Sequence, residues 1–485
     1  MYRISIAIIL FTILFSCKKE DLENNKNKTA TLQFSSDTIT FDTLFTSIGS
    51  PTKMLTVYNN NNFDIQTNIN LKGISQGHFR INVDGIPGNQ HDNIEISAND
   101  SIFIFLEVTI DPTQTNTPYI AADTLEFTTG TKQQYIDLIA WGQDAYFHTA
   151  NNFGIIIEGT DTTLFPYHEI DCTNPWENDK PHVIYGYAVI NPQQTLTINE
   201  GCNIYFHKNS GILVGNPFSS SLGSSIRVNG TLGNEVVFQG DRLDSWYTVS
   251  PKPAGQWDRI WIMPGSVNNK INYAIIKNGN VGIHADSSLI NETTIEINNT
   301  IIENMSAIGI LGQGARITAT NTIVSECGQY TVACNIGGDY NFTHCTFVNY
   351  WNNSQRTTPS ILLNNFYESA NGPIPRELNN AYFKNCIIDG SLSTELSLQN
   401  QEGIEFNYTF DHCLIKLDPT LNTNNSHYEN VIINQSPKFI NNTLSNFHLK
   451  EESPCINTGN NATEGSFDIE ENIRNNPDIG TYEFK

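Results

Sequence analysis

Residues 299–347 repeat one four-residue frame, which reads Asn299-Thr300-Ile301-Ile302, then Asn321-Thr322-Ile323-Val324, then His344-Cys345-Thr346-Phe347. The first residue is Asn or His, the second is Thr or Cys, and the fourth is a large apolar residue. The frame returns at Asn385-Cys386-Ile387-Ile388 and His412-Cys413-Leu414-Ile415, and a degenerate member, Asn272-Tyr273-Ala274-Ile275, precedes it. Self-similarity of this kind is typical of folds in which each repeat packs on its neighbours.

The spacing of the frame predicts a parallel β-helix over residues 184–452. Its members start 27, 22, 23, 41 and 27 residues apart, and four of these spacings suit one coil. The long spacing predicts a loop inserted within residues 351–377. A second frame, Gly282-Ile283, Gly309-Ile310 and Ala333-Cys334, follows at offsets of 10, 10 and 12 residues. Strand alternation then places Thr or Cys and the apolar residue inside the coil, after an Asn or His corner.

The cysteines of the frame form a ladder. Cys345, Cys386 and Cys413 occupy one inward position on successive rungs, about 4.8 Å apart. In-register Cβ vectors stay nearly parallel, which keeps them beyond the roughly 3.5–4.5 Å that a disulfide requires. We therefore expect three buried free thiols, and we expect a serine at this position to bury an unpaired hydroxyl.

Composition supports an all-β fold and argues against nucleic acid as a partner. The 485 residues include 62 Asn and 33 Gly, with only 16% charged residues, which favours turns over long helices. Short alternating strands over residues 31–144 predict a β-sandwich, followed by a connector with few repeats over 145–183. The net charge of −24 argues against nucleic-acid binding, and no motif indicates a cofactor.

The N-terminus resembles a targeting signal. Arg3 precedes an apolar run over residues 4–15, which is too short to span a bilayer. The run ends in Leu14-Phe15-Ser16-Cys17, which resembles the lipobox of bacterial lipoproteins. That resemblance implies a signal peptide over residues 1–16, lipidation at Cys17, a tether over 17–30 and the membrane as a partner. Lys18, Lys19, Glu20 and Asp21 resemble the short signal that sends lipoproteins to the exterior of the outer membrane.

Further motifs resemble one lineage of surface proteins. The sandwich segment Ile96-Ser97-Ala98-Asn99-Asp100 and the strand after it are similar to immunoglobulin-like modules. His344-Cys345-Thr346-Phe347-Val348-Asn349 resembles the repeats of pectin-lyase-like adhesins. Ser453-Pro454-Cys455-Ile456-Asn457 and Asp478-Ile479-Gly480-Thr481-Tyr482-Glu483 resemble the closing segment of the same proteins, here residues 453–485. The resemblance implies a right-handed parallel β-helix lipoprotein with an immunoglobulin-like domain, and it leaves the activity open.

The charged residues suggest no catalytic cluster. Asp241-Arg242 with Asp244 is interpreted as a corner ion pair, and Asp389 has no evident carboxylate partner. His344 and His412 are two rungs apart, about 9–10 Å, which is too far for a shared zinc. A C-terminal group of acids could hold calcium or could be solvated, namely Asp468, Glu470, Glu471 and Asp478.

Aromatic residues offer the remaining functional hypothesis. Exposed aromatic rings can stack on sugars, and the candidates are Trp246, Tyr247, Tyr350 and Trp351, while Trp257 and Trp261 are interpreted as core. The sequence therefore favours a non-catalytic adhesion, glycan-binding or scaffold role, with a polysaccharide or another envelope protein as the partner. The alternative is a polysaccharide lyase or glycoside hydrolase of the pectin-lyase-like type.

The lipid anchor can be tested at one residue. The thiol of Cys17 is the only proposed acyl acceptor side chain, so Cys17→Ala is expected to leave the precursor uncleaved and free of labelled fatty acid. Metabolic labelling with a fatty acid followed by mass spectrometry of the N-terminus measures both. Persistent acylation of the variant would contradict the assignment.

Overall fold

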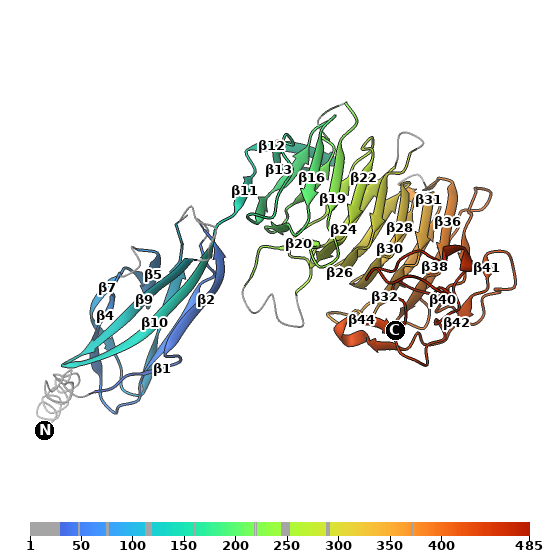
Figure 1. Cartoon of the computed structure of the whole chain (residues 1–485). Helices are drawn as coiled ribbons and strands as arrows, with labels where there is room; N and C mark the ends of the chain where they lie inside the picture. Colours follow the sequence, from blue (N-terminus) through green and yellow to red (C-terminus); the bar gives the residue numbers. More distant parts are fainter. Residues whose placement is uncertain are drawn as a thin grey trace, which may run out of the picture. The chain divides into compact units, whose positions relative to one another are not determined.

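The computed structural model describes residues 30–46, 49–73, 77–111, 119–158, 161–217, 219, 221–243, 253–287, 292–369 and 372–485. These residues are nearly all strand or turn, with short 3-10 helices at η3 (Asn442–Leu444) and η4 (Asn461–Thr463). The chain divides into two compact units, of which the first ends at Asp144 and the second begins at Ala145 (Figure 1). In the described part, no helix has the length and hydrophobicity to cross a membrane. The all-β prediction is confirmed.

The first unit is a sandwich of two five-stranded sheets. One sheet has the order β1 (Gln33–Phe34), β3 (Lys53–Asn59), β8 (Asp100–Val108), β5 (Phe79–Val83) and β6 (Ile86–Pro87). The other has the order β2 (Thr38–Phe45), β10 (Lys132–Gln143), β9 (Tyr119–Thr129), β4 (Ile65–Leu71) and β7 (Gln90–Ile96). Alternate residues such as Leu55, Val57, Ile104 and Leu106 meet in the core because successive side chains point to opposite faces. The immunoglobulin-like assignment stays a prediction.

The second unit is a parallel β-helix with three long sheets. The eleven-strand sheet contains β11 (Tyr146–Thr149), β14 (His182–Tyr185), β17 (Asn203–Phe206), β20 (Val236–Gly240), β23 (Ala274–Lys277), β26 (Ile301–Met305), β29 (Ile323–Cys327), β32 (Thr346–Asn349), β37 (Ile387–Gly390), β40 (Leu414–Ile415) and β42 (Ile432–Ile433). The ten-strand sheet contains β12 (Asn152–Glu158), β13 (Asp161–Glu169), β15 (Tyr187–Ile190), β18 (Gly211–Val214), β21 (Ile260–Ile262), β24 (Val281–Asp286), β27 (Ile308–Gln313), β30 (Val332–Asn335), β33 (Ile361–Asn364) and β38 (Leu396–Gln399).

The third sheet of the β-helix has nine strands. They are β16 (Thr195–Asn199), β19 (Ser225–Asn229), β22 (Asn269–Asn272), β25 (Ile295–Asn298), β28 (Arg316–Thr320), β31 (Gly338–Thr343), β36 (Leu378–Lys384), β39 (Thr409–Asp411) and β41 (Tyr428–Glu429). In Figure 1 the strands follow one another in sequence order along the unit, as coils of a helix do. The inward side chains of all three sheets form one continuous core. The fold class predicted from the repeat is confirmed.

The corners of the repeat adopt the left-handed backbone conformation. Among residues that have a Cβ atom, Asn is one of those that adopt it most readily. The φ angles are 47° at Asn299, 49° at Asn321, 52° at His344, 53° at Asn385 and 50° at His412. This shared conformation explains why the frame begins with Asn or His.

Two details of the sequence interpretation are wrong, the first by one residue and the second by two. Tyr273, with φ 47°, occupies the corner of its coil, so the degenerate frame starts there and not at Asn272. In the second frame, Ile310 pairs with Val332, so Thr331-Val332 replaces the predicted Ala333-Cys334 and the offset from Asn321 is again 10 residues. The repeat is therefore more regular than the sequence suggested.

Two predicted segments differ from the structure. The expected connector over residues 145–183 contains β11, β12 and β13, which already belong to the sheets of the β-helix. The expected inserted loop also contains a regular rung strand, β33, so the inserted residues fall on either side of it. The second part forms a hairpin of β34 (Phe366–Ser369) and β35 (Gly372–Pro375), which stands at the corner between the ten- and nine-strand sheets. Strand pairing with neighbouring rungs decides these assignments, and short irregular strands carry little pattern.

The C-terminal segment packs against the outer face of the eleven-strand sheet. It begins with a hairpin of β43 (Phe439–Asn441) and β44 (Asn446–Leu449), and its apolar residues meet Ile323, Ile387 and Leu414 in a second core. Arg474 is fully buried, and its guanidinium bonds Glu483 at 2.6 Å and the Asn321 carbonyl oxygen Oδ1 at 3.0 Å. The closing segment thus covers one side of the coil.

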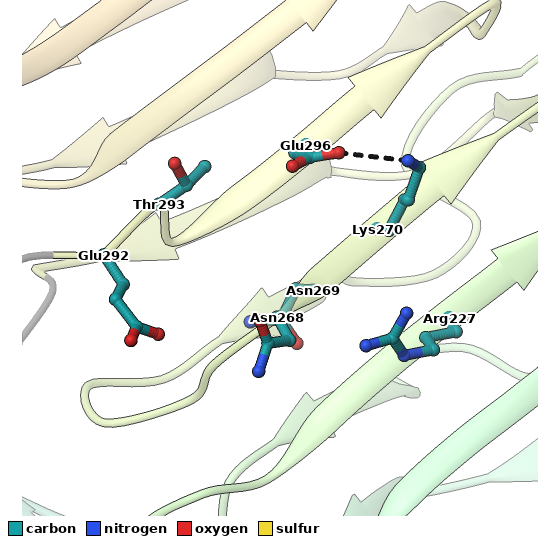
Figure 2. A pocket seen from close by; sticks show the side chains of 7 residues that line it. All are labelled: Arg227, Asn268, Asn269, Lys270, Glu292, Thr293 and Glu296. Atoms are coloured by element: carbon teal, nitrogen blue, oxygen red, sulfur yellow. Dashed lines mark ion pairs between the residues drawn. The ribbon is translucent and has the colours of Figure 1, made fainter.

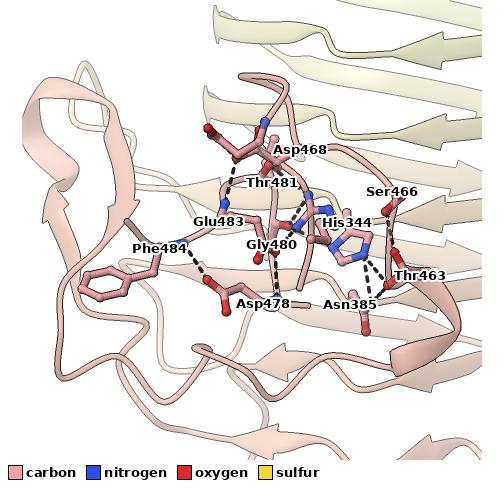
Figure 3. A network of polar contacts seen from close by, with 12 residues as sticks. His344, Asn385, Thr463, Ser466, Asp468, Asp478, Gly480, Thr481, Glu483 and Phe484 are labelled. Atoms are coloured by element: carbon pink, nitrogen blue, oxygen red, sulfur yellow. Dashed lines mark hydrogen bonds and ion pairs between the residues drawn. The ribbon is translucent and has the colours of Figure 1, made fainter. Parts of the chain in front are cut away.

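Within the part of the chain that the structure describes, the C-terminal acids are not grouped as a metal site, and their oxygens accept hydrogen bonds from the chain. Asp468 and Asp478 are buried, contrary to the solvated alternative. Asp468 accepts from the backbone N–H of Glu470 and Asn472, and Asp478 accepts from that of Asn457. Figure 3 shows two further bonds, from the backbone N–H of Glu483 to Asp468 and from that of Phe484 to Asp478. Glu470 bonds His448 and Lys485, and the phenol of Tyr273 donates to Glu471.

The cysteine ladder is confirmed, but the expectation that a serine would bury an unpaired hydroxyl is wrong. Cys345, Cys386 and Cys413 are fully buried free thiols. The Cys386 thiol donates to the Lys384 carbonyl at 3.3 Å, two residues back, and burial raises the pKa of Cys386 well above its usual range. Thr300 and Thr322 hold the equivalent position and make the same contact with Asn298 and Thr320. A hydroxyl there therefore has a partner.

We predict that Cys386→Ser and Cys386→Thr each lower the free energy of unfolding by less than about 1.5 kcal/mol, because the hydroxyl can donate to the Lys384 carbonyl. Urea unfolding measures this, and native-state alkylation should be slow for the wild type. A loss near 3 kcal/mol for both variants would contradict the shared contact. A Cys386–Cys413 disulfide found by mass spectrometry would contradict the register.

Candidate functional site

The outer face of the ten-strand sheet carries two parallel columns of side chains, which we call the outer strip. The first column, which we call the apolar column although it includes one histidine, contains Trp261, His284, Leu311, Ala333 and Leu362, which are Cα partners on successive strands from β21 to β33. Trp261 and Leu311 are half-buried, and the other three are buried by their neighbours. The polar column lies two residues further along each strand and contains Asp286, Gln313, Asn335, Asn364 and Gln399. Both columns run across the rungs because the strands are in register and parallel.

Trp261 anchors one end of the outer strip. Its indole N–H donates to Asp286 Oδ2 at 2.7 Å, and its ring stacks on His284 with centroids 4.8 Å apart. His284 is also 2.8 Å from the amide oxygen of Gln313. Trp261 lies outside the central core in which the sequence interpretation placed it; it is half-buried on the outer face, where it packs against a small buried cluster that includes Tyr187 and Leu213. Trp257 is in the core as predicted, stacked 4.3 Å from Phe206.

The ion pair of Arg259 and Asp258 lies next to Trp261 and His284. Arg259 holds Asp258 through Nε at 2.9 Å and reaches His284 Nδ1 at 3.2 Å, with its guanidinium 5.5 Å from the Trp261 ring centre. The Tyr187 phenol also donates to Asp258, and burial together with that carboxylate raises the pKa of Tyr187. These contacts fix the rings and carboxylates of the strip in place.

A hollow of about 490 Å³ adjoins the polar column, and we call it the corner hollow. Its lining includes Asp286, Gln313, Ile336, Tyr367, Arg376 and Glu377. The β34–β35 hairpin supplies Tyr367, and the residue after it is Arg376, whose guanidinium lies 5.7 Å from the Tyr367 ring centre. The hairpin is joined to the coil by backbone bonds from Gly338 to Glu377 and from Arg376 to Asn365.

A second hollow, of about 430 Å³, lies on the outer face of the nine-strand sheet. Figure 2 shows Arg227, Lys270 and Glu296 on neighbouring strands, with Lys270 and Glu296 paired at 3.1 Å. These charged side chains are exposed, so water screens them and the pair contributes about 0–1 kcal/mol. Such an arrangement is typical of a solvated sheet face.

Of the four predicted aromatic candidates, the structure describes Tyr350 and Trp351, and each is engaged by a neighbouring side chain. Tyr350 is half-buried against the C-terminal core, and its phenol donates to Asp389 at 2.6 Å. Trp351 donates its indole N–H to Ser354 at 3.0 Å. Trp246 and Tyr247 lie outside the described residues, as do Cys17, Lys18, Lys19, Glu20 and Asp21.

A buried ion pair beside Tyr350 escaped the sequence analysis. Arg356 and Glu395 are both buried and form a two-pronged contact at 2.7 and 2.8 Å. The Ser360 and Leu392 backbone N–H groups also donate to Glu395. The pair ties the first inserted segment to the next rung, which is a structural role. Asp389 lies nearby, 3.8 Å from Lys416, and burial raises the pKa of its carboxyl.

The other residues that the sequence analysis considered, Asp241, His344 and His412, make contacts that hold neighbouring parts of the chain together. Asp241 accepts from the phenol of Tyr185 at 3.5 Å and contacts His207 at 2.8 Å, which raises the pKa of His207; Asp244 lies outside the described residues. His344 is buried between the Gly480 carbonyl and the Thr463 hydroxyl (Figure 3), and His412 contacts Asp411 at 2.5 Å. Within the described residues, no three His, Cys, Asp or Glu side chains are grouped so that they could hold a metal ion.

Two stacked histidines lie at the first coil of the β-helix. His148 and His182 have ring nitrogens 3.0 Å apart, and Trp176 stacks on His182 at 4.2 Å. Burial lowers the pKa of His148 to about 3 and that of His182 to about 4. Both imidazoles are therefore neutral in the folded protein at physiological pH.

We predict that acid destabilises the β-helix through these two histidines. Unfolded imidazole has a pKa near 6.5, so their stabilisation is complete above that pH and is lost as the pH falls toward the folded values of about 3 and 4. At pH 5 the loss is about 2 kcal/mol for each histidine. Denaturant unfolding at pH 7 and pH 5 should show it, and the double variant His148→Phe with His182→Phe should lose less. An unchanged pH dependence in the double variant would refute the assignment.

Comparisons with known proteins add little to this geometry. No protein-family model matches the chain, and no curated protein matches it. Among solved structures, the catalytic domain of a GH87 α-1,3-glucanase in complex with nigerose shares 12% identity over 80% of this chain and 87% of that chain, with a TM-score of 0.22. The catalytic unit of a GH87 α-1,3-glucanase from Streptomyces thermodiastaticus strain HF3-3 shares 9% identity over 78% and 88%, with a TM-score of 0.17.

A third similarity involves a short part of the chain. The PapD-like domain 7 of human CEP192 shares 12% identity over 26% of this chain and 92% of that chain, with a TM-score of 0.17. The identities and TM-scores are low in all three cases.

Proposed function

We propose that this protein is a non-catalytic glycan-binding protein, held by lipid on Cys17 at the outer membrane and displayed on the cell exterior. The observation that carries the binding role is the outer strip, in which an apolar column and a polar column lie side by side. The anchor and the display rest on the resemblance of residues 14–21 to lipoprotein signals. A firm anchor needs more than one acyl chain, which lipidated cysteine provides in such proteins.

The two columns match the two kinds of surface that a sugar presents. A pyranose ring has apolar C–H faces and a rim of hydroxyl groups, so it can lie against an aromatic ring while its hydroxyls meet polar side chains. Trp261 offers the exposed part of a half-buried ring, which is held by its bond to Asp286 and by the stacked His284. Gln313 and Asn335 offer amides, which both donate and accept hydrogen bonds, as hydroxyl groups require.

The carboxylates of the strip are better suited to binding than to hydrolysis. Glycoside hydrolysis uses two carboxyl groups on either side of the bond, one of them held protonated by its environment. Asp286 accepts from Trp261 and contacts His284, while Asp258 is paired with Arg259. Both carboxylates are thus already engaged by donors on neighbouring side chains. The alternative of a lyase or hydrolase draws no support from these contacts.

We predict that Trp261→Ala weakens binding to a polysaccharide by about tenfold, because the variant loses the stacking ring and frees the Asp286 carboxylate. Affinity electrophoresis or calorimetry on a panel of bacterial, plant and fungal polysaccharides measures this. Phe153→Ala is the matched control, since Phe153 is 67% exposed on β12 of the same sheet and lies outside the strip.

The panel also separates the two functional hypotheses. Binding that Trp261→Ala reduces and Phe153→Ala leaves unchanged supports the proposal. Equal binding by all three proteins, or binding by none, would contradict it. Release of shorter saccharides by the wild-type protein would favour the enzyme alternative.

A further inference from the structure

We propose that the corner hollow is a second subsite of the same glycan site, and that it selects an uncharged sugar unit of an oligosaccharide lying along the β-helix axis. This inference rests on the proposed function and goes beyond it, because it assigns a direction to the ligand, a chemical class to the sugar and a role to the β34–β35 hairpin.

The direction follows from the register of the strip. Asp286 bonds Trp261, and its Cα partner on the next rung is Gln313, whose partner on the following rung is Asn335. Neighbouring rungs are about 4.8 Å apart, which is close to the length of one sugar unit in an extended chain. A saccharide along the axis therefore meets a polar side chain at every rung. Asp286 and Gln313 also line the corner hollow, so the two subsites are continuous.

The charges around the corner hollow disfavour an acidic sugar. Arg376 is the one cation among its described lining residues, and Asp286 and Glu377 are anions. The Arg376 guanidinium is already engaged by the Pro375 carbonyl at 2.9 Å and lies over the Tyr367 ring. A uronate carboxylate would meet two like charges against one partly occupied cation, within a chain of net charge −24. Sugar hydroxyls can instead donate to both carboxylates.

The backbone beneath the corner hollow is strained. Ile336, Gly337 and Gly338 have φ angles of 62°, 71° and 119° in succession. Two of the three are glycines, which adopt such angles freely, whereas Ile336 is β-branched and its left-handed conformation is unfavourable. It is the one β-branched residue with positive φ among the described residues. Strain of this kind persists where the side chain is needed, and Ile336 is half-buried in the wall of the hollow.

The test uses the full-length protein and calorimetric titration with neutral gluco- and manno-oligosaccharides, from disaccharide to octasaccharide, beside oligogalacturonates of the same lengths. Wild-type affinity should rise with the length of a neutral chain and level off once both subsites are filled. Tyr367→Ala should weaken the longer neutral chains by about tenfold and leave the shortest unchanged. Tyr135→Ala, which removes a tyrosine 50% exposed on the sandwich, is the matched control.

Ile336→Asn separates binding from folding. Asn tolerates the left-handed conformation, so the variant should melt at a higher temperature than the wild type. It should nevertheless bind the longer neutral chains more weakly, because the apolar contact is lost. A variant that gains stability and keeps full affinity would show that the hollow is not a subsite.

The outcomes distinguish the inference from the function on which it rests. Oligogalacturonates that bind as tightly as neutral chains would overturn the selection of uncharged sugars, and length-independent binding would overturn the axial direction. In both cases glycan binding itself would stand. If no oligosaccharide binds while polysaccharide binding depends on Trp261, the subsite is wrong; if neither binds, the proposed function is wrong as well.

Discussion

The in-register stacking of rungs is the constraint on which the rest of the second unit depends. Each rung contributes only a few inward side chains, such as Thr322 and Val324, and burying one apolar side chain is worth about 1.5–3 kcal/mol. A single coil cannot offset the entropy of ordering its residues, so stability accumulates by stacking. Stacking requires every coil to turn at the same place. The left-handed corners at Asn299, Asn321 and His344 provide that turn.

The same stacking leaves one outer face that the chain covers with its own C-terminal segment. The eleven-strand sheet presents Ile323, Ile387 and Leu414 outward, and these pack against Phe447 and Ile479. The corner residues take part, because Asn321 accepts a hydrogen bond from the buried Arg474 and His344 bonds the Gly480 carbonyl. Removing one member of such a network would leave a buried polar group without its partner, which costs about 1–3 kcal/mol. The corner residues Asn321 and His344 thus form the turn of the coil and also bind the C-terminal segment that packs on it.

Those features that repeat could be predicted from the sequence, whereas features made by a single contact could not. The frame that contains Cys386 predicted the β-helix and the buried thiols, since it depends on local pattern and register. It did not predict that Arg356 would pair with Glu395, because that pair joins segments 39 residues apart and neither residue belongs to a repeat. Tyr350 was interpreted as a sugar platform because its exposure cannot be deduced from one residue; the structure places it against Asp389.

The outer strip combines a repeated feature with a single contact. This explains why the sequence analysis did not find it. Asp286 and Gln313 each follow an inward isoleucine, Ile283 or Ile310, by three residues, so the second frame contained the signal for a polar column. The signal was overlooked because an outward polar residue on a strand is ordinarily solvated. What distinguishes this column is its apolar neighbour, beginning at Trp261, and that relation exists only once the rungs are stacked. A repeat fold therefore converts one rung into a linear surface of like side chains, and the hairpin that carries Tyr367 stands beside it.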